Sequence, residues 1–333
     1  MNRKTILLSV AHCLIDLACA ALYFGKLRAA TDWWTVLLLY NACAFAAQMP
    51  MGLLADAWNR NLPFAAVGVV LIALAYPLAA IPFGSAILMG LGNGAFHVGA
   101  GLEVLNDSDT RSGPLGLFVS PGAIGLYLGT AYGTFWFSNR WIVYLLLFGT
   151  LLLLFGSAAD KKEALRSENA PFVLQPSKEA ARSLLALFAV VMLRSALGMT
   201  KAFSSSVAWA MLPALCVAGG KAAGGFLADR FGMRAVSIVS LVLCSVLLCI
   251  PTDGTRLSAL LLFNMTMPLT LRKAADLLTG AKGFSFGLLT FALFVGFVPR
   301  LLNVPIPTNI VLYAALVLIS LGLLLYGWRG ERT

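Results

Sequence analysis

The chain has 333 residues, of which 60% are hydrophobic and 11% charged, and its formal net charge is +10. Soluble globular domains carry about 25% charged residues, so this composition excludes a chain that exposes most of its surface to water. The excess of positive charge does not indicate a nucleic-acid partner, because the basic residues lie in the short segments between apolar stretches.

Apolar stretches of about 20 residues, the length that crosses a bilayer as a helix, recur along the whole chain. The segments between them are too short to hold a soluble domain. We expect an all-α membrane protein with the lipid bilayer as its surroundings. The twelve predicted transmembrane helices cover residues 5–25, 34–55, 63–82, 84–105, 114–136, 140–158, 183–201, 206–228, 233–250, 257–276, 284–300 and 307–327.

A single long polar segment, residues 159–182, divides six predicted helices from six. We predict an N-terminal six-helix bundle over 1–158, a linker over 159–182 and a C-terminal six-helix bundle over 183–333. The sequence partly repeats across this linker, since Gly52 to Asp56 corresponds to Gly225 to Asp229. Such internal repeats are typical of transporters with two pseudo-symmetric bundles around a central site.

The distribution of basic residues predicts the orientation. With the N-terminus in the cytoplasm, we count 16 Lys and Arg on the cytoplasmic face and six on the opposite face. Basic residues near helix ends resist translocation, so we expect both termini to be cytoplasmic. The compact size and short loops suggest a multi-pass protein of a bacterial cytoplasmic membrane. Tryptophans fall at the predicted helix ends, where amphipathic rings are favoured. These are Trp33, Trp34, Trp58, Trp136, Trp141 and Trp328.

The segment from Gly225 to Arg234 resembles the signature loop of the major facilitator superfamily, a glycine and Leu-Ala-Asp followed by basic residues and a glycine. The first copy, from Gly52, departs from this pattern at Ala57 and Asn59. In the family this loop is a conformational latch that does not touch substrate. An aspartate at such a helix end can hold arginines or a facing helix N-terminus. The predicted latch residues are Gly52, Asp56, Arg60, Gly225, Asp229, Arg230 and Arg234.

Three short patches resemble the fosmidomycin-resistance branch of that superfamily: residues 11–16, 92–97 and 193–195. In that branch a His and an Asp four residues apart lie in helix 1, a Phe-His pair lies in helix 4 and an arginine lies in helix 7. Val98 and Gly99 replace the proline and the acidic residue that often follow the Phe-His pair, so the drug-export substrate is not transferred to this chain.

Several ionisable side chains lie inside the predicted spans, where each costs about 2.5 to 3.5 kcal/mol on insertion scales. His12 and Asp16 share a face of helix 1, and Asp16 lies near the midplane. Arg194 has a similar depth in helix 7, the equivalent helix of the second half. We therefore expect Asp16 and Arg194 to face one another across a central cavity, in a transport role rather than as a structural ion pair.

Other polar residues in the spans have a site interpretation and a packing interpretation. His97 and Asn93 share a face of helix 4, and either can line the cavity or bond a neighbouring helix. Lys221 lies inside helix 8, although a lysine stem can reach the interface. Glu103 is a proton-carrier candidate, or it reaches the membrane interface or bridges to a loop arginine. Asn264 can line the cavity or pack within helix 10.

Helix 5 contains Pro121 and a series of glycines, Gly122, Gly125 and Gly129, with further glycine at 133. Proline can kink the helix, and glycines at four-residue spacing permit a neighbouring helix to approach closely. This pattern resembles the Gly-Pro-rich helix 5 of the family's antiporters, with Ser120 where a glycine is usual, and it favours export over simple packing.

These features predict a secondary active transporter that moves a small anionic or amphipathic solute by alternating access. A proton gradient is the expected energy source and Asp16 the expected proton carrier. No motif for catalysis, ATP binding, a cofactor or a structural metal is found in the sequence, so we expect no enzyme activity. The expected partner is a small-molecule substrate, no nucleic acid binds, and the protein is expected to be a monomer.

Three alternatives stay open at this point. A divalent-metal transporter would use His12, Asp16 and His97 as ligands. A lipid or lysolipid flippase would need a cavity that opens sideways to the bilayer. A non-transporting membrane scaffold would need exposed loops for a partner, and the loops of this chain are short.

Overall fold

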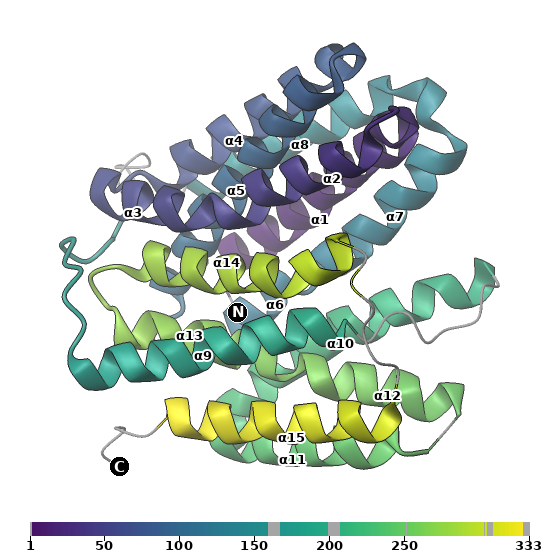
Figure 1. Ribbon diagram of the computed structural model, residues 1–333. Coiled ribbons are helices and arrows are strands. Elements are labelled where there is room, and N and C mark those ends of the chain that lie inside the picture. The colour runs from purple at the N-terminus through teal and green to yellow at the C-terminus, as the bar shows by residue number, and fades with distance from the viewer. Residues whose placement is uncertain are drawn as a thin grey trace.

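The structure, a computed structural model, describes residues 2–158, 167–198, 207–250, 252–302, 304 and 309–328, and in these ranges it contains helices and no strand (Figure 1). The first half contains α1 (Arg3–Gly25), α2 (Trp33–Asn41), α3 (Gln48–Trp58), α4 (Asn61–Ala75), α5 (Pro82–Asp107), α6 (Gly113–Val119), α7 (Pro121–Phe135) and α8 (Trp141–Ala158). The second half contains α9 (Lys178–Leu197), α10 (Val207–Phe231), α11 (Met233–Leu248), α12 (Asp253–Asn264), α13 (Thr266–Leu277), α14 (Lys282–Leu301) and α15 (Ile310–Gly327).

Short helical turns join or interrupt these helices. The π-helical turn η2 (Ala42–Ala46) lies between α2 and α3, so the predicted second span is one bent segment. Three 3-10 turns follow α1, α4 and α7 and shorten the connections to the next helices. These are η1 (Leu27–Ala29), η3 (Pro77–Ala80) and η4 (Phe137–Asn139).

Eight helical stretches of the described residues are long and apolar enough to cross a bilayer, and α4 and α11 are shorter apolar helices. The prediction of twelve spans is therefore confirmed only in part by length and hydropathy. The predicted spans 84–105 and 257–276 coincide with α5 and with α12 plus α13, which are more polar or interrupted. The predicted boundaries at 201, 206 and 307 lie outside the described residues, as does the linker segment 159–166.

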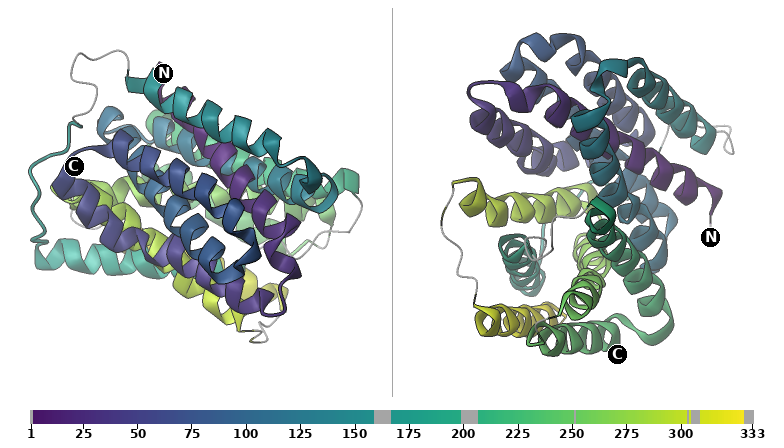
Figure 2. Two further views of the ribbon diagram at one scale, coloured as in Figure 1. Left: turned by 90° about the horizontal axis from the view of Figure 1, so that it is seen from above. Right: turned by 90° about the vertical axis from the view of Figure 1, so that its right-hand side faces the viewer.

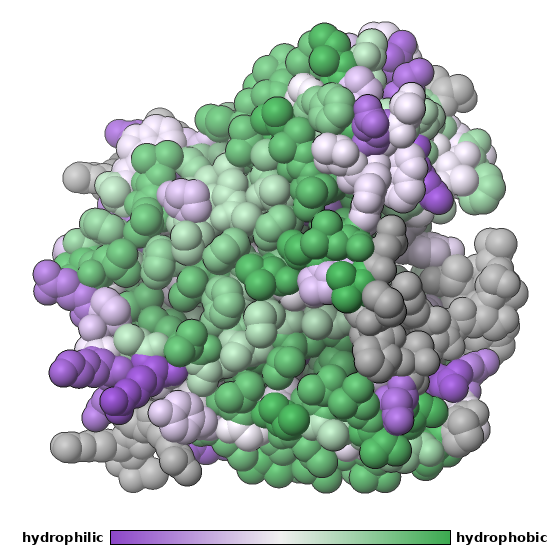
Figure 3. All heavy atoms as spheres, in the orientation of Figure 1, coloured by the Kyte–Doolittle hydropathy of each residue, from purple (hydrophilic) through white to green (hydrophobic). Residues whose placement is uncertain are grey.

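The helices of the first half, purple to teal, lie on one side of the molecule and those of the second half, green to yellow, on the other (Figures 1 and 2). The most extensive contacts between the halves are those of α14 on α3 and of α10 on α6, and α10 also packs on α7 and α14 on α5. The visible surface is apolar over its middle, and hydrophilic residues gather toward its edges (Figure 3). Such a surface matches a bilayer core between two polar interfaces.

The described end of the linker contacts both halves. The side chain of Asn169 bonds Asn61 and Asn106 of the first half, while the backbone N–H of Val173 donates to the Gly280 carbonyl of the second half at 3.0 Å. Ser177 then caps α9 by accepting from the Ala180 N–H at 3.1 Å. This cap starts α9 at Lys178, before the predicted boundary at residue 183.

Candidate functional site

A cavity of about 650 Å³ lies between the halves. Helices of the first half supply most of its wall, and α9 and α14 supply the rest. Its lining is mainly aromatic and aliphatic, with a few polar side chains, as is common for cavities that bind small organic molecules. The lining residues are Asp16, Cys19, Ala20, Tyr23, Phe24, Arg28, Trp33, Leu37, Tyr40, Asn41, Phe45, Asn93, His97, Leu126, Ser195, Leu293, Phe294 and Phe297.

A break in the fifth predicted span positions two basic side chains beside this cavity. The span is interrupted at Ser120, because Pro121 has no N–H to continue the helical bonding. Two backbone carbonyls just before the break accept bonds from side chains instead of from the next turn. The Phe118 carbonyl lies 2.7 Å from His12 Nδ1, and the Val119 carbonyl accepts from Lys221 Nζ at 3.2 Å.

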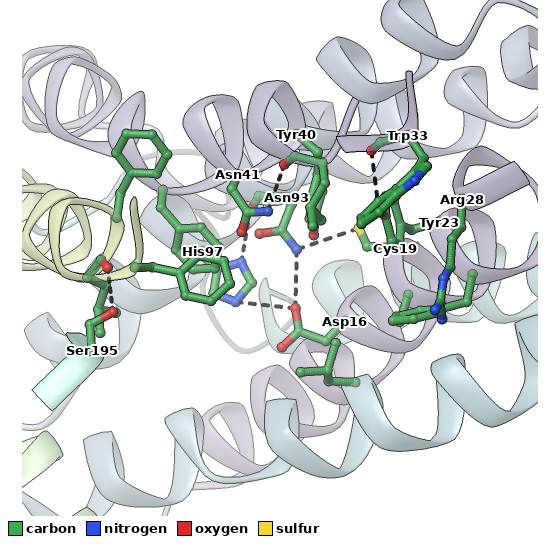
Figure 4. Close-up of a pocket in the computed structure, with 18 residues that line it drawn as sticks. Asp16, Cys19, Tyr23, Arg28, Trp33, Tyr40, Asn41, Asn93, His97 and Ser195 are labelled. Atoms are coloured by element: carbon green, nitrogen blue, oxygen red, sulfur yellow. Dashed lines mark hydrogen bonds and ion pairs between the residues drawn. The ribbon is translucent and has the colours of Figure 1, made fainter. Parts of the chain in front are cut away.

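Three ionisable side chains form a cluster at the wall of the cavity. His12 Nε2 lies 3.2 Å from one carboxylate oxygen of Asp16, and His97 Nε2 lies 3.6 Å from the other. The two Nε2 atoms are 2.8 Å apart. Asn93 donates to Asp16 at 3.2 Å, and Figure 4 shows Asn93 and His97 pointing toward the Asp16 carboxylate. The structure thus brings together the pair that the sequence analysis placed on one face of helix 1 and the pair that it placed on one face of helix 4.

The hydrogen bonds of the two imidazoles determine which ring nitrogens carry protons. His12 Nδ1 faces the Phe118 carbonyl and His97 Nδ1 faces the Asn93 carbonyl at 2.8 Å. A carbonyl oxygen only accepts, so both Nδ1 atoms must be N–H donors. In neutral rings both Nε2 atoms then carry lone pairs, and these face each other beside a carboxylate. One added cation is needed to make this contact favourable.

The three side chains of the cluster differ in how far they are exposed to the cavity. Asp16 exposes 21% of its side chain and His97 15%, whereas His12 exposes 6%. Asp16 and His97 line the cavity and His12 lies behind them. A solute in the cavity therefore reaches the carboxylate directly, while His12 acts on the solute only through its two partners.

Glycines of α7 make room for the cluster. A side chain at Gly122 would collide with His12 Nε2 and the Asp16 carboxylate. Gly125 and Gly129 lie against the backbone carbonyls of Cys13 and Leu17 on α1, where added Cβ atoms would also collide. The predicted close approach of a neighbouring helix to helix 5 is thus the packing of α7 on α1.

The repeated aspartates hold the N-termini of helices from the opposite half. Asp56 at the end of α3 accepts from the N–H groups of Gly283 and Phe284, which begin α14, at 2.8 and 2.9 Å. Asp229 at the end of α10 accepts from Ser112 and Gly113, which begin α6, at 2.6 and 2.9 Å. The unpaired N–H groups and positive dipole of a helix N-terminus stabilise a carboxylate there.

The other predicted latch residues lie around these contacts. Gly52 and Gly225 are positions where the facing backbones come too close for a side chain. Arg234 donates to the Trp328 carbonyl at 2.9 Å, Arg230 lies over the Phe231 ring, and Arg60 is exposed at the start of α4. Of the two partners considered for the aspartates, arginines or a helix N-terminus, the structure shows the helix N-terminus.

Three residues predicted for the site bond away from the cavity. The first, Arg194, is buried within the second half, donates to the Phe263 carbonyl at 3.3 Å and lies over the Phe263 ring. The structure records no ion pair between Arg194 and Asp16 in the part of the chain that it describes. The expected pairing is replaced by the two histidines, which lie on the same side of the interface as Asp16.

The other two are Glu103 and Asn264. Glu103 forms a 2.5 Å ion pair with Lys4 and accepts from Asn61 at 3.1 Å, near the helix ends that carry the aspartate contacts. Glu103 thus bridges to a basic residue, but this residue is Lys4 of α1 and not the loop arginine that was expected. Asn264 donates to the Leu260 carbonyl of its own helix at 2.8 Å.

The sequence analysis missed the aromatic lining of the cavity. Seven of the lining residues are aromatic, and they come from α1, α2, η2 and α14. An aromatic residue in an apolar span looks the same whether it faces lipid, a neighbouring helix or a cavity. No sequence signal separates these cases. The seven are Tyr23, Phe24, Trp33, Tyr40, Phe45, Phe294 and Phe297.

Comparisons with known proteins bear on the fold. No family model matches the sequence, and no curated protein matches it either. Among solved structures, the crystal structure of a single-residue variant of the E. coli fucose:proton symporter FucP is similar, with a TM-score of 0.67 and 15% sequence identity. The match covers 96% of this chain and 97% of that one. The chain therefore has the major facilitator fold of a multi-pass membrane protein.

Proposed function

We propose that this protein is a proton-coupled secondary active transporter that moves a small amphipathic solute by alternating access. The observation that carries the proposal is the cluster of Asp16, His12 and His97 at the wall of a cavity between two halves. Ionisable groups inside a membrane are costly, and in transporters they mark ion and substrate pathways. The similarity to a proton symporter supports this proposal at the level of the fold.

In the proposed architecture the chain crosses the membrane twelve times, six in each half. The eight long apolar helical stretches account for eight crossings. Helices α4, α5 and α11 and the interrupted pair α12 and α13 account for four more, each at a predicted span. The basic-residue count supports placing the N-terminus and the Asp56 and Asp229 contacts on the cytoplasmic face, and membership of the fosmidomycin-resistance branch stays a prediction.

The proposed state of this structure is closed on the cytoplasmic side. Asp56 and Asp229 each bond the opposite half there, and Thr290 donates to the Phe45 carbonyl closer to the cavity at 3.3 Å. The cavity wall includes Arg28 and Trp33, which follow the far end of α1. Opening toward the cytoplasm then requires these contacts to break while the halves rock about the cavity.

The coupling proton sits in the cluster. The distance between the two Nε2 atoms, 2.8 Å, is that of a hydrogen bond with one proton between them. Two imidazole nitrogens bound to one tetrahedral Zn²⁺ at about 2.0 to 2.1 Å would be roughly 3.3 Å apart. The 2.8 Å spacing matches a shared proton, and the ligand atoms of the three residues also lie within 4.8 Å of one another, as the divalent-metal alternative requires. Nearby titratable groups are Cys13 and Cys19 on α1, Tyr40 on α2 and Lys221 on α10.

The test measures whether protonation moves the halves. Spin labels at Thr110 and Arg230, two exposed positions on either side of the α6–α10 contact, report its opening in full-length protein in nanodiscs. The six native cysteines are replaced first. We expect the distance distribution to differ between acidic and alkaline pH and this difference to be absent in Asp16→Asn. A distance distribution that is the same at both pH values in the labelled chain with Asp16 intact would refute proton coupling. Stabilisation by Zn²⁺ that requires both histidines would favour the metal alternative.

A further inference from the structure

The chemistry of the cavity points to the class of substrate, and this inference rests on the proposed function. We propose that the cavity takes an aromatic organic cation, one flat ring system with a single protonated amine, in exchange for the proton of the cluster. The cavity supplies a wall for the ring and one accessible carboxylate for the amine.

The wall favours a planar, apolar body. Seven aromatic side chains line the cavity, with Tyr23 and Trp33 near Arg28 (Figure 4) and Phe294 and Phe297 supplied by α14. A volume of about 650 Å³ lies within the roughly 300 to 1,000 Å³ of cavities for drug-sized ligands. Rings attract other rings and cations through their quadrupole, so the same wall stabilises an aromatic body and the charge it carries.

The polar side chains of the wall place the positive group. Asp16 is the acidic residue in the lining and the most exposed member of the cluster. Its neighbours Asn93 and His97 leave part of the carboxylate open to the cavity. Arg28, the basic residue of the lining, lies 5.5 Å from the centre of the Phe24 ring, beyond the far end of α1 from Asp16. An ammonium group therefore binds best at Asp16, and Arg28 disfavours a second positive charge at the opposite end.

Charge balance makes the exchange one for one. With a proton between the two imidazoles, the cluster has one negative and one positive charge and is neutral. When a substrate ammonium donates to Asp16, the proton can leave to water, and the sum is again neutral. The empty, deprotonated cluster itself carries one negative charge inside the membrane, which is costly. Each state that is stable within the membrane thus holds one monovalent cation, either the proton or the substrate.

The experiment uses three probes that share a ring and differ in charge: 1-naphthylmethylammonium, 1-naphthalenemethanol and 1-naphthoate. Binding to the full-length protein in nanodiscs is measured by titration calorimetry in two buffers of different ionisation enthalpy, which also gives the number of protons released. We expect the ammonium to bind at least tenfold more tightly than the alcohol and to release about one proton, with its affinity falling as the pH falls. The carboxylate should bind most weakly.

Variants separate the two parts of the site. Asp16→Asn should remove the proton release and the tenfold preference for the ammonium while leaving the alcohol's affinity unchanged. Phe297→Ala should weaken the ammonium and the alcohol by a similar factor. Two variants are controls: Phe155→Ala, at an exposed aromatic residue on α8, and Glu103→Gln. Neither control should change the affinity for the ammonium or for the alcohol.

The proposal is overturned if the carboxylate binds most tightly, if the ammonium and alcohol bind equally without proton release, or if none of the three binds. In each case the spin-label measurement at two pH values then tests the proposed function separately. A pH-dependent opening would show that the proposed function stands with another substrate class, and its absence would refute the proposed function itself.

Discussion

His12 and His97 come from helices α1 and α5, and their Nε2 atoms lie 2.8 Å apart because backbone carbonyls hold the other nitrogen of each ring. The Phe118 carbonyl is available to His12 at the break before Pro121. In the proposed function, this relationship makes the cluster a unit that binds one cation, rather than a carboxylate with two independent neighbours.

Asp16→Asn removes the negative charge that compensates the shared proton. We expect the pH-dependent opening to be lost, because a neutral cluster no longer needs a cation. Glu103→Gln is the matched control, since it alters a carboxylate that pairs with Lys4 away from the cavity. Spin-label distances at two pH values measure both variants. An equal loss in Glu103→Gln would assign the pH response to the ends of the helices rather than to the cavity.

Gly122→Ala tests the fit between α7 and the cluster. The new methyl group would collide with His12 Nε2 and the Asp16 carboxylate, so the cluster must move apart at a cost of about 1 to 3 kcal/mol. We expect a lower melting temperature and a weaker pH response. Gly149→Ala on α8 is the control, because its methyl group would meet no atom within 4 Å. Equal melting temperatures for the two variants would contradict the described packing.

Asp56→Asn and Asp229→Asn test the closed face. Each substitution neutralises a carboxylate that accepts two hydrogen bonds from a helix N-terminus. A hydrogen bond to a charged group contributes roughly 1.5 to 3 kcal/mol, and we take this as the loss of stability of the closed form. We expect about 10- to 100-fold more of the open form at the Thr110 and Arg230 label pair. Asp253→Asn is the control, because Asp253 lies at the start of α12 and pairs loosely with Arg256. No change in either latch variant would mean that other contacts hold the face closed.

Asn169→Ala tests whether the linker contributes to that closure. The Asn169 side chain bonds Asn61 and Asn106, and four residues later the linker bonds Gly280 of the other half. We expect faster hydrogen exchange at Val173 and a smaller shift toward the open form than in the aspartate variants. Phe172→Ala, at an exposed neighbour, should leave both unchanged. Slow exchange at Val173 in Asn169→Ala would show that the linker holds its place without the asparagine.

Arg194→Met tests the transport role predicted for this arginine. The guanidinium is buried at Phe263 and one of its terminal nitrogens has no hydrogen-bond partner among the described residues. Replacing a poorly satisfied buried charge with an apolar side chain of similar length is often neutral or stabilising. We expect an unchanged pH response and a melting temperature that does not fall. Loss of the pH response in a folded variant would restore Arg194 to the coupling site.

Much of the helix arrangement follows from local patterns. The predicted helix at 5–25 corresponds to α1 at Arg3–Gly25, and the predicted kink at Pro121 corresponds to the break between α6 and α7. The repeat of Gly52 and Asp56 at Gly225 and Asp229 predicts equivalent contacts in the two halves, and both aspartates do bond a helix of the opposite half. Hydropathy, proline and glycine act within a few residues, so a sequence expresses them directly.

The partners of the buried charges depend on the tertiary structure. The sequence shows that Asp16 needs a partner and that His12, His97 and Arg194 are available at similar depths. It does not show which helices face each other or that a helix break offers a carbonyl to His12. Depth along a helix is a local property, whereas rotation and packing about the cavity involve residues 80 or more positions apart. The sequence by itself therefore determined the apolar helices and showed that Asp16 needs a partner, and only the folded chain decided that two histidines at the wall of an aromatic cavity are that partner.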